Sequence, residues 1–253
     1  MALLADRYQE LMALRREGLR RYRANEASTL AGPRATLTFP RFALREREGA
    51  RLSLGPLAVH DRPPIWAFVE RALAGLQRAA HVLEIGPGAG VLAKHLRARL
   101  PSNIASYSAL ERDASFCGPY TRIESVSELS TSVDLVIASE VAEHMTADQW
   151  LRDVVLPVAE VMSSDAVLVM SVPNPTSPGG IARDFTHVQN YPWYDLYALM
   201  RLEFTAVNIY RAYYAYSAQR VATLLPRILL CPLVELDWCD TLVCTASKRH
   251  NAH

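Results

Sequence analysis

The stretch from residue 81 to residue 96, HVLEIGPGAGVLAKHL, constrains the fold of this chain more than any other. A short apolar run ends with an acid, three glycines follow at alternate positions, and a helical pattern begins directly afterwards. This order predicts a buried strand, a tight turn and a helix. Gly86, Gly88 and Gly90 would let the backbone turn sharply and let a ligand approach with no Cβ in its way.

The chain beyond residue 80 repeats this alternation of strand and helix. We expect helices at 89–99, 147–163 and 192–200, and a short helix near Ala114. Strands are expected in HVLEI, YSALE, VDLVIAS, AVLVMSV, FTAVNIY and TLVCTAS, with a weaker one at 121–125. Such alternation predicts the α/β class: a Rossmann-like, seven-stranded, mostly parallel sheet with helices on both faces.

The first 63 residues form a separate unit in this interpretation, an N-terminal arm or cap. Residues 3–24 carry one apolar stripe and predict a helix, and alternating residues on both sides of Glu48-Gly49 predict a hairpin over 35–56. Residues 64–253 then form the main domain, with an insertion at about 212–238. Arginines outnumber acids in the arm, which could meet an anionic substrate group, an anionic membrane surface or only solvent.

Composition and charge argue against several classes of partner. The formal net charge of +1 gives no support for nucleic acid as the main partner. The apolar runs are far shorter than the roughly 20 residues that cross a bilayer, and the N-terminus shows no secretion signal. We therefore expect a cytoplasmic protein without an integral membrane segment. The spacing of Cys117, Cys231, Cys239 and Cys244 predicts buried free thiols, and we expect no metal site.

The glycine turn departs from the dinucleotide pattern G-x-G-x-x-G/A, because Val91 stands where the third small residue belongs. Glu84, two residues before the first glycine, disfavours a pyrophosphate. An acid there suits a ligand with a positive ammonium group, such as the methionine half of S-adenosylmethionine (SAM). A nicotinamide-dependent oxidoreductase on a similar fold is the alternative.

Four motifs resemble one enzyme family. VLEIGPGAG resembles the first motif of class I SAM-dependent methyltransferases, and VDLVIASEVAEHM resembles the fourth-strand motif of their small-molecule branch, which includes the ubiquinone- and menaquinone-biosynthesis type. SVPNP and HVQNYPWYDLYALM are similar to that branch's fifth strand and the segment after it. The four occur in the family's order over residues 80–210. The resemblance implies SAM as the cofactor and a small molecule as the methyl acceptor.

The resemblance also implies roles for the residues around the glycine turn. Gly86, Gly88 and Gly90 would shape the SAM loop, and Glu84 would lie on the side of the methionine amino group. Ser139, at the end of the fourth core strand, would lie near the sulfonium.

The adenosine half of the cofactor is implied to lie farther along the sheet. Glu111 ends the second core strand, where the family's acid accepts both ribose hydroxyls, and Arg112 would lie along the adenine edge. Ser125 stands where the branch often has an acid for the adenine amino group, so this contact departs from the family pattern.

Two histidines are candidates for a general base. His144 lies just past the fourth core strand and His187 in the loop after the fifth, so both belong to the ligand side of the sheet. Either could instead only brace its own loop. A base is needed if the acceptor is a hydroxyl or a carbon acid.

The sequence thus predicts SAM-dependent methylation of an apolar or aromatic small molecule, with oxygen slightly favoured as the acceptor. The apolar insertion at 212–238 could form one wall of the acceptor pocket. Besides the oxidoreductase, a non-catalytic SAM-binding partner protein is an alternative.

Overall fold

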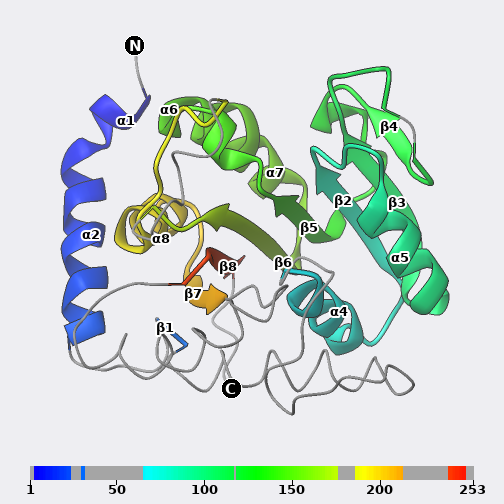
Figure 1. The fold of residues 1–253 in the computed structure, drawn as a ribbon, viewed down its shortest axis with the longest axis horizontal. Coiled ribbons are helices and arrows are strands. Elements are labelled where there is room, and N and C mark those ends of the chain that lie inside the picture. Colours follow the sequence, from blue (N-terminus) through cyan, green and yellow to red (C-terminus); the bar gives the residue numbers. More distant parts are fainter. Residues whose placement is uncertain are drawn as a thin grey trace, which may run out of the picture.

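The computed structural model describes residues 3–23, 30–31, 65–116, 118–175, 186–212 and 239–248. These residues form a single sheet with helices on both faces (Figure 1). The strands are β1 (Leu30–Ala31), β2 (Ala80–Ile85), β3 (Ile104–Leu110), β4 (Thr121–Ile123), β5 (Val133–Ser139), β6 (Met162–Pro173), β7 (Ala206–Ala212) and β8 (Thr241–Ser247).

The strand order of this eight-stranded sheet is β1-β7-β8-β6-β5-β2-β3-β4. Every pairing is parallel except those of β8, which runs antiparallel to β6 and β7. From β2 the chain proceeds outward to β3 and β4, then crosses back to β5 on the other side of β2. The strand order therefore reverses between β2 and β5, and in such sheets ligands bind beyond the carboxyl ends of the strands at this point.

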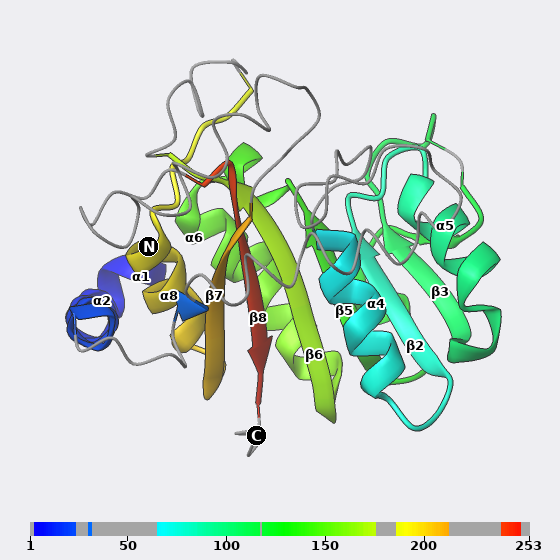
Figure 2. The same ribbon diagram turned by 60° about the horizontal axis from the view of Figure 1, so that its bottom comes forward.

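The helices of the main domain divide between the two faces of the sheet (Figure 2). One face is covered by α4 and α5, and the other by α6, α7 and α8. A π-helical turn, η5, joins α6 to α7. Their bounds are α4 (Ile65–Gly75), α5 (Val91–Arg99), α6 (Ala147–Trp150), η5 (Leu151–Val155), α7 (Leu156–Val161) and α8 (Trp193–Arg201).

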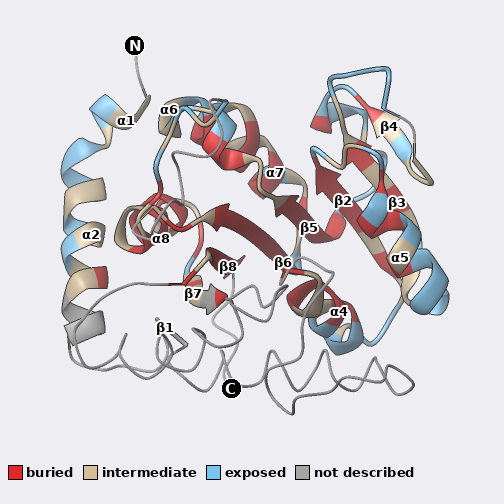
Figure 3. Ribbon diagram, in the orientation of Figure 1, coloured by how far each residue is buried: buried red, intermediate tan, exposed pale blue. Residues whose placement is uncertain are grey.

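The central strands are buried on both sides, as Figure 3 shows. In β2, Leu83 and Ile85 pack with the α6–α8 side, whereas Val82 packs with the α4–α5 side. A strand covered by helices on both faces needs apolar residues at consecutive positions. This requirement explains the continuous apolar run in the sequence. The sheet with helices on both faces confirms the predicted fold class.

The seven predicted strands are all present, but two local details differ from the prediction. The short strand β1 pairs with β7 at the edge of the sheet and was not predicted. The helix expected near Ala114 is wrong, because residues 114–115 form a turn. The Asp113 carboxylate accepts a hydrogen bond from Ser115 N at 2.8 Å, and side-chain bonds of this kind compete with helix formation.

The N-terminal helix forms an additional layer outside α8 (Figure 1). It comprises α1 (Leu3–Asp6) and α2 (Tyr8–Arg23). Gly18 allows the close approach, since a Cβ there would lie 2.7 Å from Tyr197 Cδ1 on α8. The Tyr197 hydroxyl donates to Glu17 at 3.1 Å, and Arg15 Nε lies 2.6 Å from an Asp195 carboxylate oxygen. The predicted hairpin over 35–56 and most of the insertion lie outside the described residues.

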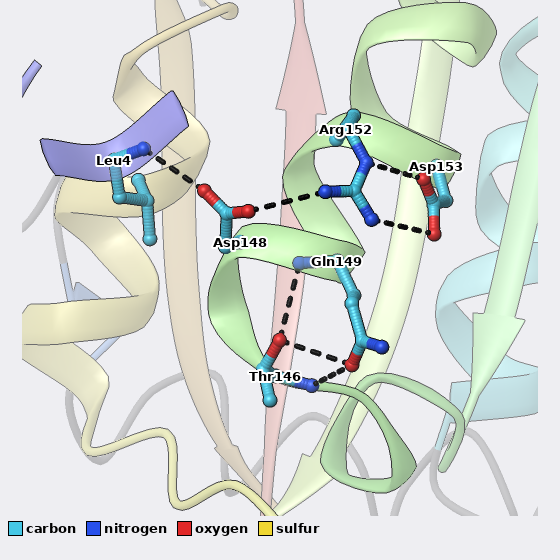
Figure 4. Close-up of polar contacts among 6 residues, drawn as sticks. All are labelled: Leu4, Thr146, Asp148, Gln149, Arg152 and Asp153. Carbon is cyan, nitrogen blue, oxygen red and sulfur yellow. Dashed lines mark hydrogen bonds and ion pairs between the residues drawn. The ribbon is translucent and has the colours of Figure 1, made fainter. Parts of the chain in front are cut away.

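The first turn of the arm is attached to α6 (Figure 4). Leu4 N donates to the Asp148 carboxylate at 3.0 Å. A capping box starts α6: Thr146 Oγ1 accepts from Gln149 N, and Gln149 Oε1 accepts from Thr146 N. The arm thus meets the sheet's ligand side through the helix that follows His144. No helix in the described part of the chain is long and apolar enough to span a membrane.

Candidate functional site

The loop between β2 and α5 is built on left-handed backbone. Gly86, Gly88 and Gly90 have φ values of 61°, 51° and 66°. A Cβ on Gly90 would lie 2.8 Å from Tyr120 Cε1, so packing alone requires a glycine there. A Cβ on Gly88 would meet no atom of the described residues within 4 Å. The loop is therefore open at Gly88, where a ligand could approach the backbone.

Glu111 lies directly against this loop. One oxygen of its carboxylate accepts from Gly88 N at 3.3 Å and the other from Asp113 N at 3.0 Å. Tyr120 holds the other side of the loop by donating to Gly88 O at 2.8 Å. An acceptor carboxylate thus stands beside the open glycine loop, at the carboxyl end of β3.

Glu84 lies below the loop, buried in the sheet at 4% exposure. The Tyr107 hydroxyl on β3 donates to its carboxylate at 2.7 Å. Burial raises the pKa of Glu84 to about 7, and the hydrogen bond from Tyr107 opposes this rise in part. Glu84 therefore lies near the end of β2, and its carboxyl group is partly protonated at neutral pH.

Arg112 and Ser125 lie beyond Glu111 on the β3–β4 edge. Arg112 is exposed, and its carbonyl accepts from Arg122 Nη2 at 3.2 Å. Ser125 caps the short 3-10 helix η3 (Val126–Glu128): its hydroxyl accepts from Ser127 N at 3.2 Å, while its own amide donates to Glu128 at 2.8 Å. The structure therefore gives Ser125 a local capping role at this edge.

The end of β5 faces the glycine loop across the reversal of strand order. Ser139 is paired in register with Ser171 of β6, and Glu140 N donates to Ser171 O at 3.1 Å. Glu140 has a φ of 53°, a strained value for a residue with a Cβ, and such strain gathers at functional sites. Burial raises the pKa of Glu140 to about 7. The sequence analysis did not single out Glu140, although its place after β5 was a usable signal.

The structure brings His144 and His187 together. Their ring centroids lie 5.0 Å apart at an interplanar angle of 71°. His144 ends the 3-10 helix η4 (Ala142–His144), and Glu143 of that helix lies 4.0 Å from His187 Nε2 through its Oε1. We call Glu143, His144 and His187 the histidine cluster. The sequence analysis missed Glu143, whose only signal was its place beside His144.

Backbone hydrogen bonds join the two loops that carry the histidine cluster. Val188 N and Gln189 N both donate to Glu143 O, at 2.8 and 3.1 Å. His144 Nδ1 lies 3.0 Å from Thr186 Oγ1 and 3.3 Å from Thr186 O. These hydrogen bonds hold the cluster at the carboxyl end of β5, the strand that pairs with β2.

Comparison with known families agrees with this arrangement. Residues 58–214 match the sequence model of a family described as a methyltransferase domain. A comparison with curated protein sequences gave no match.

Two solved structures share the fold. A SAM-dependent methyltransferase from Archaeoglobus fulgidus aligns with a TM-score of 0.51 and 19% identity, over 72% of this chain and 92% of its own. A putative methyltransferase from Haloferax volcanii, solved with the Trm112 methyltransferase activator, aligns with a TM-score of 0.52 and 14% identity, over 73% of this chain and 90% of its own.

The family match covers more than half of the chain, and it favours SAM over a nicotinamide as the cofactor of the glycine loop. The chain belongs to the methyltransferase domain family and is a class I SAM-dependent methyltransferase.

Proposed function

We propose that this enzyme transfers the methyl group of SAM to a small molecule, with a hydroxyl oxygen as the favoured acceptor. The observation that carries the proposal is the histidine cluster, which follows β5, the neighbour of the strand β2 that leads into the open glycine loop. SAM supplies the reactive methyl group, so the protein's task is alignment and proton removal. A hydroxyl acceptor must lose its proton, and a pair of imidazoles beside the transfer site suits that step.

The cofactor would lie along the carboxyl ends of β2, β3 and β5. Gly86, Gly88 and Gly90 would hold its methionine half, which Glu84 would favour through its charge. The Glu111 carboxylate would accept hydrogen bonds from the ribose hydroxyls, which its position 3.3 Å from Gly88 N supports. Arg112 and Ser125 would border the adenine, and Ser139 would lie near the sulfonium.

His187 is our first choice for the proton acceptor, and His144 for the residue that orients it. The His187 side chain is 11% exposed and lies beside the Glu143 carboxylate, whereas His144 is exposed and held by Thr186. A carboxylate beside an imidazole stabilises the imidazolium that forms when a proton is taken. This pairing supports the assignment of His187.

The acceptor would be apolar or aromatic. Val188, directly after His187, has 60% of its surface exposed, so an apolar side chain is available beside the cluster. We propose a cytoplasmic location, supported by the buried thiols of Cys239 and Cys244, and no nucleic-acid partner, supported by the net charge of +1.

The test is transfer of an isotope-labelled methyl group from SAM into an extract separated into small-molecule, protein and nucleic-acid fractions. We expect label in the small-molecule fraction, and mass spectrometry of the product should place the methyl group on oxygen. Label confined to protein or nucleic acid would overturn the proposed acceptor class. SAM binding without transfer to any fraction would favour the non-catalytic partner alternative.

A further inference from the structure

We propose that the histidine cluster, Glu143, His144 and His187, binds one divalent transition-metal cation. Each residue offers one ligand atom, and these atoms all lie within 4.8 Å of one another. Two imidazoles and one carboxylate form a donor set that suits zinc, iron, cobalt or nickel better than magnesium or calcium, which prefer oxygen donors throughout. Three protein donors also leave a coordination position open, as in catalytic metal sites.

The ligand atoms of the cluster lie slightly farther apart than they would around a bound ion. Donors bound tetrahedrally at about 2.1 Å lie roughly 3.4 Å from one another. His187 Nε2 and Glu143 Oε1 are 4.0 Å apart, so a small side-chain rotation brings them to that spacing. His144 is exposed and can make the larger adjustment without disturbing the core.

The surroundings of the cluster have the features that orient metal ligands. A histidine ligand commonly donates its second ring N–H to a carbonyl or another oxygen, which determines the tautomer. Thr186 O is a pure acceptor 3.3 Å from His144 Nδ1, so it favours a proton on Nδ1 and a lone pair on Nε2. The bonds from Val188 N and Gln189 N to Glu143 O hold the two ligand-bearing loops together before any ion binds.

The burial of the Glu143 carboxylate is also compatible with a bound cation. The Glu143 side chain is 3% exposed, and a buried carboxylate is favoured by a positive charge nearby. Among the described residues, His187 would supply that charge when protonated, and a bound cation would supply it as well. The two possibilities make different predictions, because a salt bridge binds no added metal.

A cation bound here would change how the methyl acceptor loses its proton. This consequence rests on the proposed function, whereas the metal site itself does not. An imidazole whose lone pair is bound to a metal cannot take a proton at that nitrogen. A metal instead lowers the pKa of an oxygen bound to it. His187 would then act as a ligand when the ion is present.

The experiment uses the full chain stripped with EDTA and dialysed. Co²⁺ and Zn²⁺ are titrated by calorimetry, and the Co²⁺ sample is followed by visible absorption. We expect one ion per chain. His144→Gln and Glu143→Gln should each weaken binding by at least about tenfold. Because His144 is exposed, its variant should remain folded even if Glu143→Gln does not.

The control is the buried contact between His95 and Glu70, where a carboxylate meets a histidine on the α4–α5 side of the sheet. His95→Gln should leave cation binding within about twofold of the unmodified protein. No binding up to about 1 mM, or equal binding in the unmodified protein and both cluster variants, would overturn the site. Thermal shift with S-adenosylhomocysteine on the same samples tests the cofactor separately, so a failed metal site leaves the methyltransferase assignment intact.

Discussion

The backbone amide of Gly88 donates a hydrogen bond to the Glu111 carboxylate across 3.3 Å. This contact joins the loop after β2 to the end of β3, the two segments that would meet the cofactor in the proposed site. The same carboxylate also accepts from Asp113 N at 3.0 Å, so its two oxygens are aligned by backbone before a ligand arrives. Such alignment lowers the entropy lost when the cofactor binds.

Glu111→Ala should weaken SAM binding by about 1.5–3 kcal/mol, the usual range for hydrogen bonds to a charged group. Calorimetry with SAM measures the loss. The fold should persist, since Glu111 lies at a strand end and is only partly buried. Asp165→Ala, which removes an exposed acid from β6, is the control and should bind SAM normally. A loss of less than about threefold would mean that another group holds the ribose.

Gly88→Val should abolish the rise in melting temperature that S-adenosylhomocysteine produces. The φ of 51° disfavours a branched residue, and the new side chain would enter the open space at the loop. Gly75→Val tests general tolerance, because a Cβ at Gly75 also meets no atom of the described residues within 4 Å and the position has no left-handed φ. A folded Gly88→Val protein that still binds the ligand would refute the assigned loop.

Gly18→Leu should destabilise the protein by about 1–3 kcal/mol, the usual cost of overpacking. The new side chain would collide with the Tyr197 ring, since even a Cβ comes within 2.7 Å of it. Urea denaturation measures the change, and Gly75→Leu is the matched control. Gly18→Leu also tests whether the packing of α2 on α8 contributes to stability. Unchanged stability would show that α2 separates from α8 at little cost, as a movable cap over the acceptor would require.

Glu84→Gln should make stability less dependent on pH. The raised pKa of Glu84, about 7, means that the folded state keeps a proton that the unfolded state releases above about 4.5. The free energy of unfolding is therefore highest below that pH and falls toward pH 7, by up to about 1.4 kcal/mol per pH unit. Glutamine still accepts from Tyr107 but does not titrate.

Urea denaturation at several pH values between 5 and 8 tests this expectation. Between pH 5 and pH 7 the unmodified protein should lose on the order of 2 kcal/mol more unfolding free energy than the variant does. Replacing exposed Glu160 of α7 with glutamine should leave the slope unchanged. Parallel curves for Glu84→Gln and the unmodified protein would contradict the raised pKa.

In the EDTA-treated enzyme, where His187 holds no ion, His187→Ala should lower kcat by about two to four decades while SAM affinity changes little, the effect expected for a lost general base. His144→Ala should cost less. Single-turnover kinetics with the labelled acceptor measure both, and His81→Ala, on β2 beside Ser106, is the control. Full activity in both cluster variants would point to an acceptor that needs no base, such as a free amine or a carboxylate.

The sequence by itself determined the strand and helix alternation, because a sheet buried on both faces demands continuous apolar runs such as HVLEI and VDLVIAS. It also located the glycine turn, since the left-handed φ values there suit glycine. Both signals depend only on residues that are close together in the sequence, so one sequence is enough to detect them. The mistaken helix near Ala114 shows where they weaken: one carboxylate bond from Asp113 decides that turn.

Only the tertiary structure decided which distant groups meet. Glu143 and His187 are 44 residues apart along the chain, and their contact depends on how β5, β6 and the following loop are placed. The burial of Glu84 against Tyr107 and the packing of Gly18 on Tyr197 likewise depend on strand register and helix position. No periodicity encodes these contacts, because each arises when the crossovers bring separate elements to one edge or face of the sheet.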